Sequence, residues 1–303
     1  MPGITEDRIG TKRTTFHART STSTTSSYWN PSMTENETPV ASVILLAGSN
    51  RCGPSRSSHG DSLIGPPGTS CKALIPLHDG RTCIDCVLDA LRESHSVATV
   101  VVVGETALAE AAQQAGAQLV EQGVSVVENL FIGFSSLGWP RQCLICTCDV
   151  PLLTPASVDF IVRAGTEVNA DVVYPIISRE VSEAAFPRAR RTYATLTDGT
   201  FTGGNLMLLN GEFVRRSKST IQSVFAARKS PIKLCRMLGL RFILRFLMKK
   251  LSVAEVERRV CSLLNCTGRA LVCPFPEVGF DVDQPEDLEA VSEFMQRPSR
   301  QPG

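Results

Sequence analysis

The sequence of 303 residues has almost no net charge, few aromatic residues and no long apolar run. Its 31 Lys and Arg face 30 Asp and Glu, which argues against bulk attraction to nucleic acid and leaves only a local basic patch open. Aromatic residues make up 6% of the chain, too few for a base-stacking surface. No stretch of about 18 uncharged apolar residues occurs, which excludes a membrane-spanning helix. Hydrophobic residues still make up 43%, enough for the core of an α/β protein.

Disulfide bonds are not expected either, although the chain has 11 cysteines. Their number is odd and most lie within apolar stretches, so we expect free thiols in a reducing, cytoplasmic setting. Two Cys-x-x-Cys pairs, Cys83 with Cys86 and Cys143 with Cys146, raise the question of zinc. The second pair lies in an expected strand, where residues three apart point to opposite faces and cannot share one ion. We therefore do not expect a zinc site.

Three regions are expected along the chain. Residues 1–40 contain fifteen Ser or Thr and very few aliphatic residues, so we expect a disordered tail, with synthesis starting at Met1 or at Met33. Residues 41–296 are expected to form one domain, followed by a short disordered tail at 297–303. Within the domain, Ser230 and Pro231 favour a helix start, and Ser252 with Glu255 forms a capping-box pattern. Residues 230–265 therefore predict a helical hairpin.

The first helix of this hairpin is rich in Leu, Ile and Phe and carries Arg241, Arg245 and Lys249 at i, i+4 spacing. One interpretation is a basic amphipathic helix at a membrane surface. We favour the other, a hairpin packed on the sheet with its basic residues in water.

Strand and helix patterns alternate from residue 41 onward, which predicts βαβ units and a mainly parallel sheet. Ligands of such sheets bind outside the carboxyl ends of the strands. The expected strands are residues 42–48, 97–104, 117–120, 142–148, 170–177, 205–210 and 270–273. The expected helices are residues 82–94, 106–115, 125–137, 155–164, 211–228 and 285–295.

The first expected strand ends at Gly48 and leads into a stretch rich in Gly, Pro and Ser. A glycine-rich turn there exposes backbone N–H groups that can bind phosphate oxygens. Arg51, Arg56 and Lys72 could neutralise a triphosphate. The phosphate-binding lysine of a Walker loop and the dinucleotide glycine pattern are both absent. A flexible surface loop is the alternative interpretation.

Carboxylates follow two other expected strands. Asp149 comes directly after the buried strand 142–148, where a carboxylate with phosphate oxygens could hold Mg²⁺. Its alternative role, capping the next helix, suits Thr154 better. Asp281 and Asp283 are two residues apart in an extended segment, so we expect their side chains to share one face. Two such carboxylates repel unless a cation or hydrogen-bond donors lie between them.

A fourth segment could bind an anionic acceptor. Arg188, Arg190 and Arg191 offer positive charge, or else form a solvated basic loop. They are followed by Gly203-Gly204-Asn205, where the glycines allow close approach of a ligand and Asn205 can donate and accept hydrogen bonds.

The segments VILLAG, KALIP, CDVPLLTP, FTGGN and DVDQPEDL, in this order, resemble those of the MobA-like nucleotidyltransferases. The resemblance covers about residues 42–295. It implies a three-layer α/β/α, Rossmann-like GT-A fold with a mainly parallel sheet, here with a C-terminal helical insertion. It also implies transfer of a nucleoside monophosphate from GTP or CTP to a phosphate-bearing small molecule, with Mg²⁺ and release of pyrophosphate.

The resemblance also implies roles for particular residues. The triphosphate is expected at Leu46, Ala47, Gly48, Ser49, Arg51 and Lys72. The base and ribose are expected near Ser125 and Asn129, and the metal at Asp149 together with Asp281 or Asp283. The acceptor is expected near Arg191, Gly203, Gly204 and Asn205. Lys72, Asp149 and Arg51 would be the catalytic residues.

Two alternatives from other classes remain. A nucleotide-binding regulatory protein would bind the triphosphate without releasing pyrophosphate. A GT-A glycosyltransferase would use Asp281 and Asp283 as its metal motif, although this pair lies unusually near the C-terminus.

Overall fold

The computed structural model describes residues 41–48, 71–228 and 236–296. The tails expected at 1–40 and 297–303 lie outside the described residues, as do Ser49, Arg51, Arg56 and the expected helix start at Ser230 and Pro231. Within the described part, no helix is both long and apolar enough to cross a bilayer.

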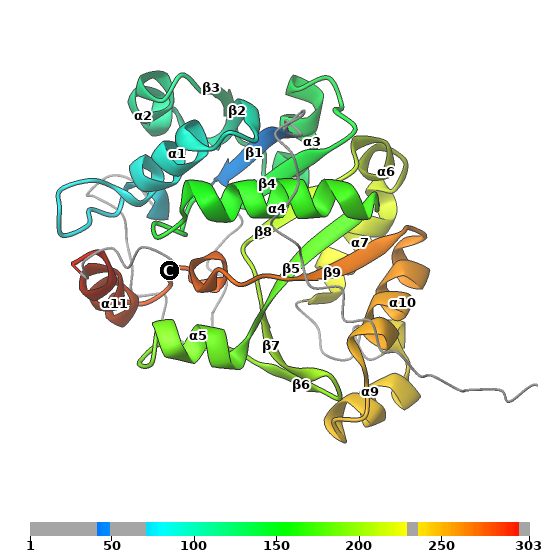
Figure 1. The fold of residues 1–303 in the computed structure, drawn as a ribbon. Coiled ribbons are helices and arrows are strands. Elements are labelled where there is room, and N and C mark those ends of the chain that lie inside the picture. The colour runs from blue at the N-terminus through cyan, green and yellow to red at the C-terminus, as the bar shows by residue number, and fades with distance from the viewer. Residues whose placement is uncertain (1–40, 49–70, 229–235, 297–303) are drawn as a thin grey trace, which may run out of the picture. The chain divides into compact units, whose positions relative to one another are not determined.

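A nine-stranded mixed sheet forms the centre of the domain (Figure 1). The spatial order is β3-β2-β1-β4-β8-β5-β7-β6, and β9 pairs with β5 along its other edge. Strands β3, β2, β1 and β4 are parallel, whereas β8 runs antiparallel to both β4 and β5. The strands are β1 (Ala41–Ala47), β2 (Val97–Gly104), β3 (Gln118–Glu121), β4 (Cys143–Thr147), β5 (Val172–Ser178), β6 (Ala194–Leu196), β7 (Gly199–Gly203), β8 (Leu206–Leu209) and β9 (Gly268–Val272).

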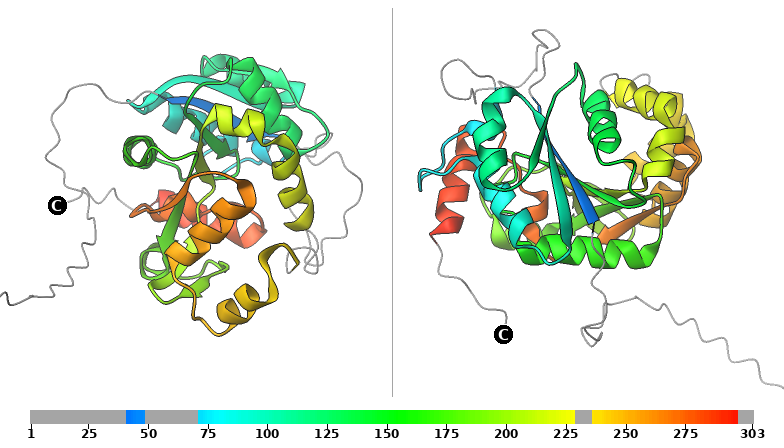
Figure 2. Two further views of the ribbon diagram at one scale, coloured as in Figure 1. Left: turned by 90° about the vertical axis from the view of Figure 1, so that its right-hand side faces the viewer. Right: turned by 90° about the horizontal axis from the view of Figure 1, so that it is seen from above.

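Helices cover both faces of the sheet, which confirms the predicted three layers (Figures 1 and 2). The described helices are α1 (Cys83–Glu93), α2 (Ala109–Gln114), α3 (Val126–Ser136), α4 (Pro155–Val168), α5 (Arg179–Ala185), α6 (Gly211–Arg216), α7 (Lys218–Arg228), α9 (Leu240–Leu247), α10 (Val253–Leu264) and α11 (Pro285–Met295). Short 3₁₀ turns lie at Lys72–Leu74, Thr106–Leu108 and Pro276–Gly279.

Alternation along β1 explains the two core layers. Val43 and Leu45 belong to the cluster formed with α1 and α4, whereas Ile44 belongs to the cluster formed with α3 and α6. All three side chains are fully buried. A strand covered on both faces has no solvent side, so an uninterrupted apolar run is the pattern it requires.

Two kinds of element differ from expectation. The predicted helix at 211–228 is interrupted at Ser217 and forms α6 and α7. The β6–β7 hairpin and α5 were not predicted at all. The hairpin turns at Thr197 and Asp198, and Gly199 opens β7 with a φ of 147°, a conformation that favours glycine.

Helices α9 and α10 lie within the predicted helical region. The predicted capping box at the start of α10 is confirmed, because Ser252 accepts from the Glu255 N–H while Glu255 accepts from the Ser252 N–H. Of the predicted basic stripe, Arg241 and Lys249 are exposed, and Arg245 is 38% exposed but also has protein partners. Its guanidinium forms a two-pronged ion pair with Glu255 and also donates to the Lys250 carbonyl.

The chain order changes direction in the sheet between β1 and β4. Strands β2 and β3 lie in turn on one side of β1. The chain then returns through α3 and places β4 on the other side of β1. Such a switch point opens a crevice at the carboxyl ends of the two strands. Gly48 follows β1 and Asp149 comes two residues after the end of β4, so the topology alone brings both to this crevice.

Phe134 provides a test of this packing. The ring is fully buried in the α3 layer and stacks on Trp139 with 5.6 Å between ring centroids. We expect Phe134→Ala to lower the free energy of unfolding by about 3–5 kcal/mol, measured by urea denaturation. The control Val272→Ala, at a side chain that is 59% exposed, should change it by less than about 1 kcal/mol. A cost at Phe134 no larger than that of the control would contradict this arrangement.

Candidate functional site

Gly48, directly after β1, has no room for a side chain. A Cβ atom on Gly48 would lie 2.3 Å from Gln122 Oε1 and 2.6 Å from Asn129 Nδ2. Both neighbours are buried, so neither can move out of the way easily. Glycine at this position therefore keeps the backbone directly against the end of β3 and the start of α3. Leu46 and Ala47, also expected near a triphosphate, are the last residues of β1, and Leu46 pairs with Thr147 in β4.

Asn129 braces the loop that leads into α3. Its side-chain oxygen accepts a hydrogen bond of 2.7 Å from the Gly123 N–H. Ser125, one turn earlier, accepts from the Glu128 N–H and so caps the helix. The structure thus brings the two residues expected near base and ribose to the same edge as Gly48, and both have a role in shaping the loop.

Gln122 belongs to this edge but was missed by the sequence analysis. It comes directly after β3, lies against Gly48, and donates from Nε2 to Glu105 Oε1 at 3.3 Å. The rule that selected Gly48 and Asp149, namely to inspect the residues after each strand, would also have selected Gln122.

Lys72 reaches the strand ends because the residue before it is buried. The Cys71 thiol donates to the Ala47 carbonyl over 3.5 Å, which fixes the chain beside the end of β1. Lys72 then starts a 3₁₀ turn, and its ammonium lies 3.1 Å from Asp283 Oδ1. A cation from an early segment and a carboxylate from a late one, 211 positions apart, thus meet at the crevice.

Asp149 has an unusual environment for a carboxylate. Its Oδ1 atom is shielded from solvent and has no hydrogen-bond partner among the residues that the structure describes. Burial has the largest effect and raises the pKa of Asp149, and the charge of the nearby Asp283 also raises it, while the Thr147 side chain and Lys72 act in the opposite direction. A buried carboxylate oxygen without a donor is costly, so its position indicates that a positively charged group belongs there.

The segment with Asp281 and Asp283 is not a strand, yet it is fixed firmly. The Val282 N–H donates to the Asp149 carbonyl over 2.8 Å, which ties this segment to the end of β4. Phe280 and Val282 are buried in a small apolar cluster with residues of α1 and α11. Asp287, in the first turn of α11, accepts from the N–H groups of Asp283 and Gln284 at 3.0 Å each.

These contacts bring three carboxylates together. One oxygen from each of Asp149, Asp281 and Asp283 lies within 4.8 Å of the other two. Burial raises the pKa of Asp281 to about 6, and the charges of Asp149 and Asp283 act in the same direction against the opposing effect of Arg191. Like charges this close are stable only with a compensating cation or bound protons.

The donor set fits a hard divalent cation. Three carboxylates of mixed exposure, one with an unpaired buried oxygen, are the ligands that Mg²⁺ and similar ions prefer. This is the one cluster of potential ligands found in the described part of the chain, and it contains no cysteine.

Arg191, expected to contact an acceptor, is itself engaged with the acidic cluster. Its guanidinium donates to the Asp281 carboxylate and carbonyl, lies 3.7 Å from Asp287 Oδ1, and stacks on the Phe280 ring at 4.2 Å from its centroid. The side chain is only 10% exposed. Arg191 therefore orients Asp281 and offsets part of the negative charge.

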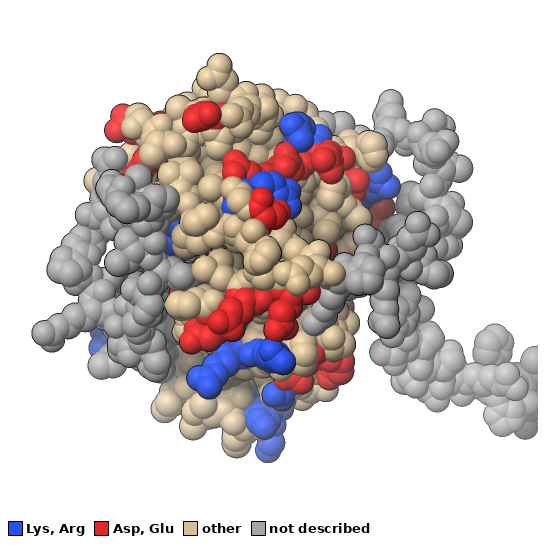
Figure 3. Space-filling model, turned by 90° about the vertical axis from the view of Figure 1, so that its left-hand side faces the viewer, with Lys and Arg blue, Asp and Glu red and all other residues tan. Residues whose placement is uncertain are grey.

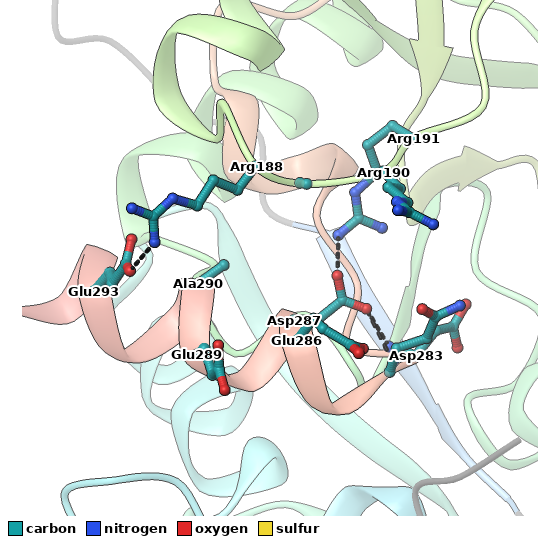
Figure 4. A pocket seen from close by; sticks show the side chains of 11 residues that line it. Arg188, Arg190, Arg191, Asp283, Glu286, Asp287, Glu289, Ala290 and Glu293 are labelled. Atoms are coloured by element: carbon teal, nitrogen blue, oxygen red, sulfur yellow. Dashed lines mark hydrogen bonds and ion pairs between the residues drawn. The ribbon is translucent and has the colours of Figure 1, made fainter.

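A hollow of about 410 Å³ opens beside this arginine, between the loop at 188–191 and α11 (Figure 4). Arg190 and Arg191 lie across it from Asp283 and Asp287, as Figure 4 shows. Arg190 is exposed and forms no ion pair with any of the described residues, whereas Arg188 pairs with Glu293 at 2.8 Å. Figure 3 shows this side of the molecule, with a band of acidic atoms next to a band of basic ones.

Gly203, Gly204 and Asn205 form the turn between β7 and β8, at the strand end next to β4. A Cβ atom on Gly203 would lie 2.2 Å from the Tyr174 hydroxyl oxygen. The Asn205 N–H donates to the Val278 carbonyl over 2.8 Å, which places this turn beside the segment that leads to Asp281. Its glycines therefore serve close packing against β5 and the late segment.

The raised pKa values predict how stability depends on pH. Between about pH 4 and pH 6 the folded protein binds more protons at Asp149 and Asp281 than the unfolded chain, whose carboxyls have ordinary pKa values near 3.9. The free energy of unfolding should therefore fall as pH rises through this window.

Asp149→Asn removes one of these charges and should therefore raise the free energy of unfolding of the cation-free protein at pH 7, because the raised pKa of Asp149 means that its charge is disfavoured in the folded state. The difference should vanish near pH 4. Urea denaturation in a chelator across this pH range measures it. A destabilised variant at pH 7 would show that Asp149 is already neutralised by the protein.

The comparisons with known proteins agree with this geometry. The family model described as a MobA-like NTP transferase domain matches residues 43–230. A search of curated proteins found no match. The chain is similar to a structure titled a hypothetical transferase from Thermus thermophilus, with 37% identity and a TM-score of 0.68 over 82% of this chain and 99% of the other.

More distant structures share the fold. CMP:2-keto-3-deoxy-manno-octonic acid synthetase, in complex with CTP, aligns with 14% identity and a TM-score of 0.51 over 84% of this chain and 98% of its own. A 4-diphosphocytidyl-2C-methyl-D-erythritol synthase from Anaerococcus prevotii aligns with 10% identity and a TM-score of 0.52 over 86% and 97%. The GT-A-like fold expected from the sequence is thus confirmed. By its domain match and its Thermus relative, the chain belongs to the MobA-like NTP transferase family and is a nucleotidyltransferase.

Proposed function

We propose that this chain transfers a nucleoside monophosphate from GTP or CTP to a small molecule that carries a phosphate, with Mg²⁺ bound and pyrophosphate released. The observation that supports this most is the meeting of Asp149, Asp281 and Asp283 with Lys72 at the switch point of the sheet. The cysteine pattern of the sequence suits a reducing cytoplasm as the place of the reaction.

The donor triphosphate is proposed to bind over the turn after β1. Gly48 has no side chain to block access to its backbone N–H, and the Lys72 ammonium lies 3.1 Å from Asp283, one of the three carboxylates. A triphosphate would compete with Asp283 for the Lys72 ammonium, because both are anions. Ser49 and Arg51 are proposed to contact phosphates on sequence grounds, and Ser125 with Asn129 is proposed to shape the base and ribose subsite.

The acceptor is proposed to bind in the hollow beside α11. Arg190 is exposed, and Arg191 lies next to it, so an incoming phosphate would find positive charge on the side facing Asp283. The turn at Gly203, Gly204 and Asn205 would close the other side of the reacting phosphate. An acceptor there lies next to the metal-binding carboxylates, as a direct transfer requires.

The reaction needs positioning more than acid–base chemistry. A phosphate oxygen of the acceptor would attack the α-phosphorus of the nucleotide, and the bond from that phosphorus to the β-phosphate oxygen would break to release pyrophosphate. The acceptor phosphate is already ionised at neutral pH, so no side chain has to remove a proton. The chain's task is to hold two anions together and to stabilise the spreading negative charge.

Asp149, Asp281 and Asp283 would hold the divalent ion, which supplies charge neutralisation at the α-phosphate. Lys72 would stabilise the leaving pyrophosphate oxygens. Arg191 would keep Asp281 oriented through its contacts with both the carboxylate and the carbonyl. In the absence of nucleotide, the Lys72–Asp283 ion pair keeps these two charges partly neutralised.

Asp149→Asn and Lys72→Met test the two charged parts of the site. We expect Asp149→Asn to abolish pyrophosphate release and Lys72→Met to lower kcat by about 10²–10³-fold, because each stabilises charge that develops during transfer. Pyrophosphate release is measured with each nucleoside triphosphate, Mg²⁺ and a set of phosphorylated acceptors.

Glu212→Gln, an exposed carboxylate on α6, serves as the matched control and should retain full activity. Full activity in Asp149→Asn would overturn the metal assignment. Binding of a triphosphate to the wild type without pyrophosphate release from any acceptor would favour a regulatory protein instead.

Arg190→Ala tests the acceptor subsite. We expect the KM for the acceptor to rise by about tenfold or more, with the KM for the nucleotide unchanged, because one charged hydrogen bond is lost on one substrate only. Steady-state kinetics with each substrate varied in turn measures this. Arg215→Ala, another exposed arginine, should change neither constant. A rise confined to the nucleotide KM would place the triphosphate, not the acceptor, in the hollow.

A further inference from the structure

Helix α9 leaves a row of apolar side chains exposed, while its Phe242 and Ile243 are half-buried. The row repeats every three or four positions along the helix and ends with the residue just after it. Its members are Leu240 (72% exposed), Leu244 (49%), Leu247 (70%) and Met248 (53%). At 100° per residue these four side chains lie on one side of the helix. No residue of α9 is fully buried. A helix at the edge of a domain normally turns such a row toward the core, so this orientation is reversed.

The reversed orientation is fixed by contacts on the opposite side. Arg245 pairs with Glu255 of α10 by both guanidinium nitrogens and donates to the Lys250 carbonyl. The loop between α9 and α10 is held to the β6–β7 hairpin, because the Thr197 N–H donates to the Leu251 carbonyl and Asp198 accepts from the Val253 N–H. Helix α9 lies at the outer end of this arrangement, beyond α10 and the hairpin (Figures 1 and 2).

The charge around the apolar row has one sign. Residues 236–265 contain seven basic and only two acidic residues, although the whole chain is nearly neutral. Both acids are engaged, Glu255 with Arg245 and Glu257 with Arg269 and the Ala270 N–H. Six of the seven basic residues form no ion pair within the described part of the chain: Arg236, Arg241, Lys249, Lys250, Arg258 and Arg259, the last of which donates to the Met237 carbonyl.

We propose that α9 docks this enzyme on an anionic lipid surface. Leucine and methionine would enter the boundary between headgroups and acyl chains, while Arg241, Lys249 and Lys250 would meet lipid phosphates and carboxylates. Eight residues make a helix of about 12 Å, far shorter than the bilayer core, so α9 lies in the surface and does not cross it. A second copy of the chain fits less well, because pairing two α9 helices would bring their cations together.

This surface is separate from the residues assigned to catalysis, so it can be altered without touching them. The experiment measures co-sedimentation of the full chain with vesicles of phosphatidylcholine alone or mixed with phosphatidylserine at about 7:3. We expect the wild type to bind the mixed vesicles at least about tenfold more tightly than the neutral ones, and less tightly as salt is added.

Two variants separate the apolar and the charged contributions. Leu244→Glu with Leu247→Glu should lower binding to mixed vesicles at least about tenfold, and Lys249→Glu with Lys250→Glu should do the same. Val272→Glu, at an equally exposed apolar side chain on β9, is the matched control and should bind as the wild type does. Pyrophosphate release without vesicles should be the same in all of these proteins, which shows that they remain folded.

Three results would overturn the proposal. The first is no binding of the wild type to either vesicle, and the second is equal binding to neutral and anionic vesicles. The third is a dimer in sedimentation velocity that Leu244→Glu with Leu247→Glu dissociates while vesicles are ignored, because α9 would then be covered by a second copy.

Discussion

Three carboxylates held within 4.8 Å of one another are the constraint on which this structure depends. Their mutual repulsion and partial burial oppose folding at neutral pH, so the rest of the fold must hold them in place. It does so from three directions. Asp149 follows a central strand, Val282 is bonded to the Asp149 backbone, and the Phe280 ring supports the arginine that orients Asp281. Lys72 pairs with Asp283 at 3.1 Å.

The arrangement explains why the site lies where it does. A parallel sheet leaves a crevice where its chain order reverses, and the turn after β1 can approach that crevice because Gly48 has no side chain. The buried Cys71 then brings Lys72 to the same edge. Gly48 and Cys71 thus pack the backbone closely, and the charged groups of Lys72 and Asp283 meet in the crevice. The stability given up by the carboxylates is thus offset by an ordinary apolar core on both faces of the sheet.

The sequence predicted the layers, the strand ends and the residues that meet at the crevice, because apolar runs and the residues after them depend on local pattern. It could not predict the contacts of long side chains. Arg191 was expected to face a ligand, but it stacks on Phe280 and pairs with Asp281, a partner 90 positions away. The ion pair of the partly exposed Arg245 with Glu255 was not predicted either. The β6–β7 hairpin was missed because its strands are short and its turn residues, Thr197 and Asp198, are not a typical hairpin pair. Gln122 also directly follows a strand, β3, and was not predicted.

The central claim, that a divalent cation binds at these three carboxylates beside a triphosphate, is tested most directly by anomalous diffraction. Crystals grown with Mn²⁺ and a non-hydrolysable nucleoside triphosphate should show a manganese peak in contact with Asp149 and with Asp281 or Asp283, and with a phosphate oxygen over the turn at Gly48. Because Mn²⁺ takes the same oxygen ligands as Mg²⁺, it is a suitable probe. A bound triphosphate with manganese elsewhere, or with no peak at Asp149, would contradict the account.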